Sequence, residues 1–226
     1  MTQSYTAETP ADDYRKDFLY RGAVCRAAGR KRPELVPIAD ECRATVGNID
    51  SRKTQLQQIE DDLVLARAVE SAEKLEAIEA YDMVRKQLAA YDKGRVLELM
   101  PVPPSTAAKL ALEKFDYRVS QAISNIKTLP ETHPVRRDFL PALEREFAEF
   151  QEADVGEDEV RRALTTMKIS LTTFKAELAQ LRDKELGQIQ VLYGDRGKVE
   201  FFTLPWRSNS AVKKDEPEPV PVPTPA

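Results

Sequence analysis

The sequence is poor in the residue types that most catalytic and metal sites require. Its 226 residues include one histidine, two cysteines and eight glycines. A single histidine excludes a di-iron site built on paired Glu-x-x-His motifs, and no cysteine–histidine spacing fits a zinc site. No glycine pattern matches a phosphate-binding loop or the nucleophile elbow G-x-S-x-G. We therefore expect a protein that is not an enzyme and that uses no cofactor, metal or small-molecule substrate.

Long apolar runs and an excess of positive charge are also missing. No stretch approaches the roughly 18–20 apolar residues of a membrane span, and the opening MTQSYTAETPADDYRKDF lacks the apolar core of a signal peptide. The net charge is −4, so no global field draws the chain to nucleic acid or anionic lipid. Cys25 and Cys42 form no C-x-x-C pair, and we interpret them as buried apolar side chains in a reducing compartment. These features predict a cytoplasmic location.

The composition that remains is typical of long helices. Alanine, leucine, glutamate, lysine and arginine are abundant, and apolar residues recur every three or four positions. The sequence therefore predicts an all-α fold. The expected helices cover 11–28, 34–46, 51–91, 105–126, 134–150 and 157–192. Breaks are predicted at VGNIDSRK (46–53) and EADVGEDE (152–159), because each stretch combines a glycine with residues that cap helices.

The predicted helix 51–91 is the longest, and it contains neither glycine nor proline. About forty helical residues span roughly 60 Å, and a helix of that length needs partners along its course. We expect its apolar residues to form one packed side: Leu56, Ile59, Leu63, Ala66, Val69, Leu75, Ile78, Val84 and Leu88. The long helices would then pack antiparallel, as in a coiled coil, within one chain or across a dimer.

Two similar segments end the two halves of the chain. YDKGRVLELMP covers 91–101, and YGDRGKVEFFTLP covers 193–205. Three pairs of like residues share an offset of 103: Asp92 and Asp195, Gly94 and Gly197, Val96 and Val199. The match indicates an internal duplication; the alternative is that a glycine between two cations is a common way to end any helix. The apolar residues after each glycine are predicted to be extended and able to pair as a small two-stranded sheet.

The duplication predicts two tandem three-helix units that form an elongated antiparallel helical bundle. The expected organisation is a disordered N-terminus (1–10), a first helical unit (11–101), a proline-rich joint (102–104), a second helical unit (105–206) and a disordered, charged and proline-rich tail (207–226). Each unit is expected to end in a short extended apolar segment.

Two groups of residues are candidates for binding partners. Phe201, Phe202 and Trp206, here called the aromatic segment, either close the bundle as a plug or form a docking surface for a protein. The second group, here called the basic segment, consists of Arg15, Lys16, Arg21, Arg26, Arg30, Lys31 and Arg32. These cations can attach to acidic lipid or nucleic acid, or acidic neighbours within the bundle can neutralise them.

The leading functional prediction is a non-enzymatic scaffold, adaptor or structural assembly protein. It would act through its helical surfaces and the aromatic segment, by binding protein partners or by self-association into a homo-oligomer. The alternative prediction is peripheral attachment to a membrane or to nucleic acid through the basic segment.

Overall fold

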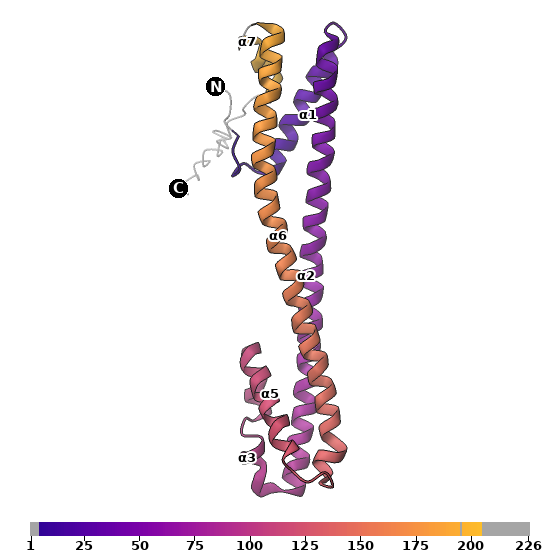
Figure 1. Cartoon of the computed structure of the whole chain (residues 1–226), viewed down its shortest axis with the longest axis vertical. Coiled ribbons are helices and arrows are strands. Elements are labelled where there is room, and N and C mark those ends of the chain that lie inside the picture. The colour runs from indigo at the N-terminus through magenta and orange to yellow at the C-terminus, as the bar shows by residue number, and fades with distance from the viewer. Residues whose placement is uncertain (1–4, 195, 205–226) are drawn as a thin grey trace, which may run out of the picture. The chain divides into compact units, whose positions relative to one another are not determined.

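The described part of the chain is built from helices, turns and short connections. The computed structural model describes residues 5–194 and 196–204, and no strand occurs within these ranges. The predicted all-α class is confirmed. The principal helices are α1 (Ala11–Ala28), α2 (Val36–Tyr91), α5 (Leu112–Lys127) and α6 (Leu140–Tyr193) (Figure 1). The shorter ones are η1 (Pro33–Leu35), η2 (Lys93–Arg95), α3 (Val96–Leu99), α4 (Pro104–Ala107), the π-helical turn η3 (Val135–Phe139), α7 (Arg196–Val199) and η4 (Glu200–Phe202).

The two longest helices run through the glycines where breaks were predicted. Gly47 lies inside α2 and Gly156 lies inside α6, so both predicted breaks are wrong. A lone glycine in a helix interior costs only about 1 kcal/mol, and neither stretch contains a proline that would remove a helical hydrogen bond. None of the helices in the described ranges combines the length and the apolar character that crossing a membrane requires.

Local chemistry explains where the helices begin and end. Helix α1 has Asp12 and Asp13 in its first turn and Arg26 in its last turn, which places each charge at the favourable end of the helix dipole. Helix α6 ends at Gly194, whose φ is 65° and whose N–H donates to the Gln190 carbonyl oxygen at 2.9 Å. This left-handed glycine is the residue that most readily ends a helix.

The segments after the two long helices are helical rather than extended. VLEL forms α3, and VEFF runs from the end of α7 into η4. The predicted extended segments, and their pairing as a sheet, are therefore wrong. Val96 and Leu99 are both buried, as are Val199 and Phe202. Each pair is three residues apart, so one helical turn buries both side chains, and this packing outweighs the weak strand preference of the residues.

The described residues form two compact units. Unit 1 contains those within Met1–Ser51 and Leu171–Ala226, and unit 2 contains Arg52–Ser170. Helices α2 and α6 each contribute to both units, so the units do not coincide with the predicted ranges 11–101 and 105–206. The internal duplication stays a prediction.

Unit 1 has a core contributed by α1, the first part of α2, the last part of α6, α7 and η4. Its buried apolar residues are Tyr14, Phe18, Cys25, Leu35, Ile38, Ala39, Cys42, Ile49, Leu178, Ile189, Val199 and Phe202. Tyr5, within the range predicted to be disordered, packs its ring 5.0 Å from that of Tyr14. The predicted disordered tail, 207–226, lies outside the described residues.

Unit 2 has a second core shared by α2, α3, α5 and α6. Phe115 of α5 meets Phe150 of α6 edge to face, with 5.2 Å between ring centroids, and the Tyr81 hydroxyl donates to the Val102 carbonyl oxygen at 2.9 Å. Within α2 this cluster begins at Ala77. Earlier in the same helix, Leu63 is buried outside the cluster.

Candidate functional site

Unit 1 contains a buried cluster of four charged side chains. Asp17 and Arg21 come from α1, whereas Arg182 and Glu185 come from α6, and all four are at most 5% exposed. The Arg21 guanidinium donates to Asp17 and, at 2.5 Å, to the Glu185 carboxylate. Arg182 Nε donates to Asp17 Oδ2 at 3.1 Å. Two acids and two bases therefore neutralise one another within the core, as buried charges must.

The cluster joins α1 to the end of the described chain. The backbone N–H of Leu204 donates to Asp17 Oδ1 at 3.3 Å, and the Arg182 guanidinium lies 4.4 Å from the centroid of the Tyr5 ring. Charged and directional contacts specify one alignment of α1 on α6, which apolar contacts alone would leave less defined.

Both cysteines are buried beside this network and are free thiols. Burial raises the pKa of Cys25 to about 11, and burial together with the Glu185 carboxylate raises the pKa of Cys42 further. The Cys42 Sγ lies 3.5 Å from both Glu185 carboxylate oxygens, and its S–H donates a hydrogen bond to that carboxylate. Each thiol therefore stays protonated at neutral pH, which is unfavourable for nucleophilic catalysis.

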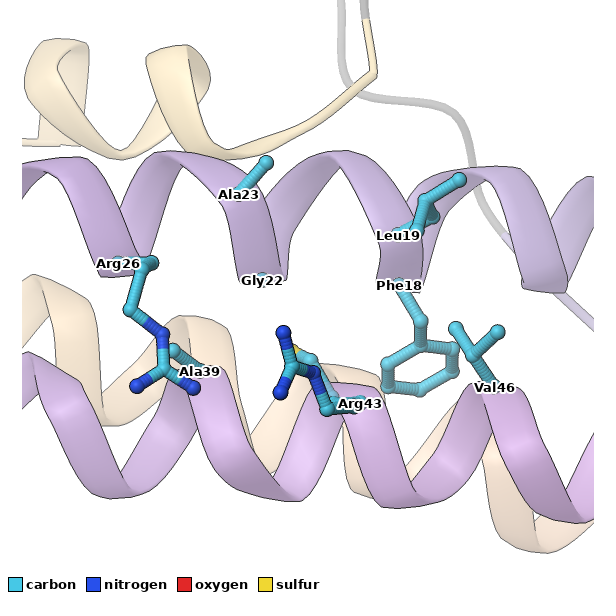
Figure 2. Close-up of a pocket in the computed structure, with 9 residues that line it drawn as sticks. Phe18, Leu19, Gly22, Ala23, Arg26, Ala39, Arg43 and Val46 are labelled. Atoms are coloured by element: carbon cyan, nitrogen blue, oxygen red, sulfur yellow. The ribbon is translucent and has the colours of Figure 1, made fainter.

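A cavity of about 200 Å³ lies between α1 and α2 in unit 1 (Figure 2). Its wall is formed by Phe18, Leu19, Gly22, Ala23, Arg26, Ala39, Cys42, Arg43 and Val46. Figure 2 shows Arg26 and Arg43 reaching into the space between the two helices, with Phe18 and Val46 beside them. Arg26 is bonded to Asp40. Cys42, the one thiol of the lining, has a raised pKa and stays protonated at neutral pH.

Unit 2 exposes a second line of apolar residues on α2. Leu65, Ala68, Ala72 and Leu75 are spaced three, four and three residues apart, the spacing of a helix–helix seam. Leu65 and Leu75 are 65% and 56% exposed, whereas Leu63, two positions before Leu65, is 7% exposed. A shift of two residues turns a side chain by about 200°, so this line lies opposite the buried side of the helix.

Two further exposed side chains, Val64 and Val69, widen this line. We call the set Val64, Leu65, Ala68, Val69, Ala72 and Leu75 the outer stripe. The prediction that Val69 and Leu75 belong to the packed side of the helix is wrong. The sequence signal that could have separated the two sides is the seam spacing, because a single apolar face cannot accommodate both Leu63 and Leu65.

Acidic residues surround the outer stripe on the same helix. Asp61 lies one turn before Leu65, and Glu76 and Glu79 lie one turn after Ala72 and Leu75. We call Asp61, Asp62, Glu73, Glu76 and Glu79 the acidic border. From Gln57 to Met83 the chain has eight acidic residues but only two cations, Arg67 and Lys74.

Both of these cations bond to other parts of unit 2. Arg67 Nε donates to Glu157 of α6 at 3.0 Å, and the Lys74 ammonium donates to the Leu110 carbonyl oxygen at 3.0 Å. The Lys74 ammonium also lies 5.3 Å from the centroid of the Phe115 ring. The acidic residues of α2 around the outer stripe therefore outnumber its cations. Helix α6 contributes an exposed cation, Arg145, which bonds to Glu146 and lines the same hollow as Glu76 and Glu79.

Part of the acidic border lies close to another carboxylate, that of Glu149 on α6. Carboxylate oxygens of Glu73, Glu76 and Glu149 lie within 4.8 Å of one another. Partial burial, followed by the charges of Glu76, Glu149 and Glu146, raises the pKa of Glu73. Glu73 Oε2 is buried and has no hydrogen-bond partner in the described part of the chain. The three carboxylates are close enough to share one cation, whether a metal ion or the charged end of a lysine or arginine.

The basic segment is divided between ion pairs, the core and the surface. Arg15 forms two hydrogen bonds with Asp50, Lys16 lies 3.8 Å from Asp13, and Arg26 bonds to Asp40. Arg21 is fully buried, so it does not belong to any surface patch.

The end of the basic segment is exposed. Arg30, Lys31 and Arg32 lie on the surface after α1. Arg32 donates to the Leu192 carbonyl oxygen at 2.7 Å and stacks over the Tyr193 ring at 4.5 Å. The structure therefore brings only part of the predicted group together on one surface.

The aromatic segment is also divided. Phe202 is 4% exposed and packs in the core of unit 1, with its ring centroid 5.4 Å from that of Tyr193. Phe201, the next residue, is 72% exposed. Trp206 lies outside the described residues. The buried contacts of Phe202 agree with the predicted role of a plug. The exposure of Phe201 agrees with the predicted role of a docking residue.

Comparison with protein-family models, curated proteins and solved structures gives no match.

Proposed function

We propose that the protein is a non-enzymatic helical scaffold or adaptor that acts through protein–protein contacts. The observation that carries this proposal is the outer stripe of α2. Six neighbouring apolar side chains are exposed on the side of the helix that faces away from its core contacts. Contiguous apolar surface with a polar border is characteristic of interaction sites, because covering it removes apolar area from water.

The long helices suit this role because each offers many exposed side chains to a partner. Helices α2 and α6 contain 56 and 54 residues. We further infer an internal duplication and antiparallel, coiled-coil-like packing of these two helices. The repeated order of a medium helix, a long helix and a short helical turn, namely α1, α2 and α3 followed by α5, α6 and α7, supports the duplication.

The remaining features agree with a binding role in the cytoplasm. Free, buried cysteines suit a reducing compartment, and the protonated thiols suit a protein without nucleophilic chemistry. Attachment to membrane or nucleic acid through the basic segment has weaker support, because Arg15 and Arg26 are paired with carboxylates and Arg21 is buried.

Affinity capture of the full-length chain tests the proposal. We expect the tagged protein to retain one or more partners reproducibly from extracts of the cells that produce it. The variant Leu65→Asp/Val69→Asp should lose them, because two charges replace apolar contact area. The matched control is Val191→Asp, which changes a residue that is 84% exposed in unit 1. A chain that retains nothing and is monomeric at high concentration would contradict the proposal.

A further inference from the structure

We propose that the outer stripe and the acidic border together bind an amphipathic helix of a protein partner, one whose apolar seam is flanked by lysine or arginine. This inference rests on the proposed function and names the chemistry of the partner. It concerns residues of unit 2 only, from Asp61 to Glu79 on α2 with Glu149 on α6.

The spacing of the stripe selects a helix as the occupant. Leu65, Ala68, Ala72 and Leu75 follow the alternation of three and four residues by which one helix packs against another. The two small residues lie between the two leucines, so a second helix can approach closely at the centre while the leucines contact it at both ends. An extended peptide would instead require unpaired strand backbone, and no strand occurs in the described part of the chain.

The charge around the stripe selects a basic partner. The acidic border consists of Asp61, Asp62, Glu73, Glu76 and Glu79. The nearby cations are engaged with other groups: Arg67 with Glu157, Lys74 with Leu110, and Arg145 of α6 with Glu146. Flanking charges decide which helices pair, because opposite signs attract and like signs repel across the seam. Lysine or arginine beside the partner's seam would pair with this border.

The crowded carboxylates add a specific contact for the partner. Glu73, Glu76 and Glu149 place three carboxylates together at one edge of the stripe, and Glu73 Oε2 has no hydrogen-bond partner within the described residues. A guanidinium or ammonium group inserted here would satisfy that oxygen and reduce the repulsion among the three charges.

A second copy of the chain is a poor occupant of the same surface. Its stripe would be bordered by the same acidic residues, and the pairing would bring carboxylates against carboxylates. Such like-charge pairs at a helix interface are destabilising. Pairing of two stripes is therefore disfavoured, and the occupant we propose is a different protein.

Fluorescence anisotropy with synthetic peptides tests this inference on the full-length chain. The probe is a labelled peptide of about three heptads, with Leu and Ala at the seam and Lys at the flanking positions. Two matched peptides carry Glu in place of Lys, or Ser in place of the seam Leu. We expect the Lys peptide to bind at least about tenfold more tightly than either control, and its affinity to fall as salt is added.

Protein variants locate the binding. Leu65→Ser/Leu75→Ser should weaken binding of the Lys peptide about tenfold or more, because both side chains contribute seam contacts. Glu76→Lys/Glu79→Lys should weaken it by a similar factor at low salt and less at high salt. The control Val191→Ser should stay within about twofold of the wild type, since it leaves unit 2 unchanged. All of these side chains are exposed, so the variants should keep the wild-type circular dichroism spectrum and should melt at no lower temperature than the wild type.

Several results would overturn the inference. These are equal binding of the Lys and Glu peptides, no binding of either, or binding that the two stripe substitutions leave unchanged. A dimer in sedimentation equilibrium that Leu65→Ser/Leu75→Ser dissociates would assign the stripe to self-association instead. If affinity capture retains a partner through the stripe but that partner's contact helix is acidic or neutral, this inference falls while the scaffold function stands.

Discussion

The guanidinium of Arg21 lies 2.5 Å from the carboxylate of Glu185, although the two residues are 164 positions apart in the chain. Both side chains are fully buried, and Arg21 also bonds to Asp17 four residues earlier in α1. A charge in this position is stable only while its partner is present, because water cannot replace the lost contact. The pair therefore makes the docking of α1 sensitive to single substitutions.

Glu185→Ala is expected to lower the free energy of unfolding by about 3 kcal/mol or more, because it leaves Arg21 with excess buried positive charge. Urea unfolding monitored by circular dichroism measures the change. Lys184→Ala, which removes a pair 3.5 Å from Glu41 on the surface, should cost less than about 1 kcal/mol. Arg21→Met/Glu185→Leu should recover part of the loss. A Glu185→Ala variant as stable as the Lys184→Ala variant would contradict this account.

The two buried thiols are expected to make stability fall at alkaline pH. Burial raises the pKa of Cys25 from 9.0 to about 11, and the pKa of Cys42 is raised as well. The unfolded chain therefore loses these protons at lower pH than the folded chain, and stability decreases as pH rises above about 9. Between about pH 8 and about pH 10, the wild type should lose roughly 1 kcal/mol per thiol more than Cys25→Ala/Cys42→Ala. Parallel pH profiles for the two proteins would refute the burial of the thiols.

Replacing glycine by alanine is expected to raise the free energy of unfolding at two positions and to lower it at two others. At Gly47 and Gly156 a Cβ would meet nothing within 4 Å, so alanine should stabilise each helix by up to about 1 kcal/mol. At Gly22 the added Cβ would lie 3.0 Å from Cys42 Cβ, and at Gly29 it would lie 2.9 Å from Val36 Cγ2. Alanine there should destabilise the contact between α1 and the region around the start of α2. Thermal unfolding of the four variants distinguishes the cases, and destabilisation by Gly47→Ala would indicate a helix break at that position.

The two adjacent phenylalanines of η4 are expected to differ in how much each contributes to the stability of the fold. Phe202 is buried against Tyr193, so Phe202→Ala should cost about 3 kcal/mol or more. Phe201 is mostly exposed, so Phe201→Ala should change stability by less than about 0.5 kcal/mol. Chemical denaturation of both variants gives the comparison. Equal losses would mean that Phe201 is also packed in the core.

The helical class and most helix positions were predictable because they depend on local periodicity. The predicted helix 11–28 matches α1 at both ends, where proline, acidic residues and glycine mark the boundaries. The breaks at Gly47 and Gly156 were predicted wrongly because a glycine is a weak signal by itself, and the helix-forming residues around it decide the outcome. The extended segments were predicted wrongly because tertiary packing of Val96 and Val199 outweighed local preference.

The candidate surfaces were less predictable because they depend on which helix face is covered. Arg21 looks like a surface cation in sequence, since nothing near it in the chain reveals that Glu185 neutralises it within the core. Leu65 of the outer stripe lies only two positions after Leu63, so apolar residues point to opposite sides of the helix. Periodicity alone does not say which of these two sides is buried. The seam spacing and the small number of cations near the stripe are visible in the sequence. Whether Arg67 and Lys74 can offset the acidic residues depends on where their side chains point, which only the structure shows.

Site-specific photo-crosslinking reports whether another protein covers the outer stripe. A photoreactive amino acid placed at position 65 of the full-length chain, in cells that naturally produce the protein, would report what lies against the outer stripe. We expect one discrete adduct with a different protein from position 65 and no such adduct from position 191, which is exposed in unit 1. A chain that remains free of adducts at position 65, or that gives the same adducts from both positions, would contradict the proposal that a different protein binds there.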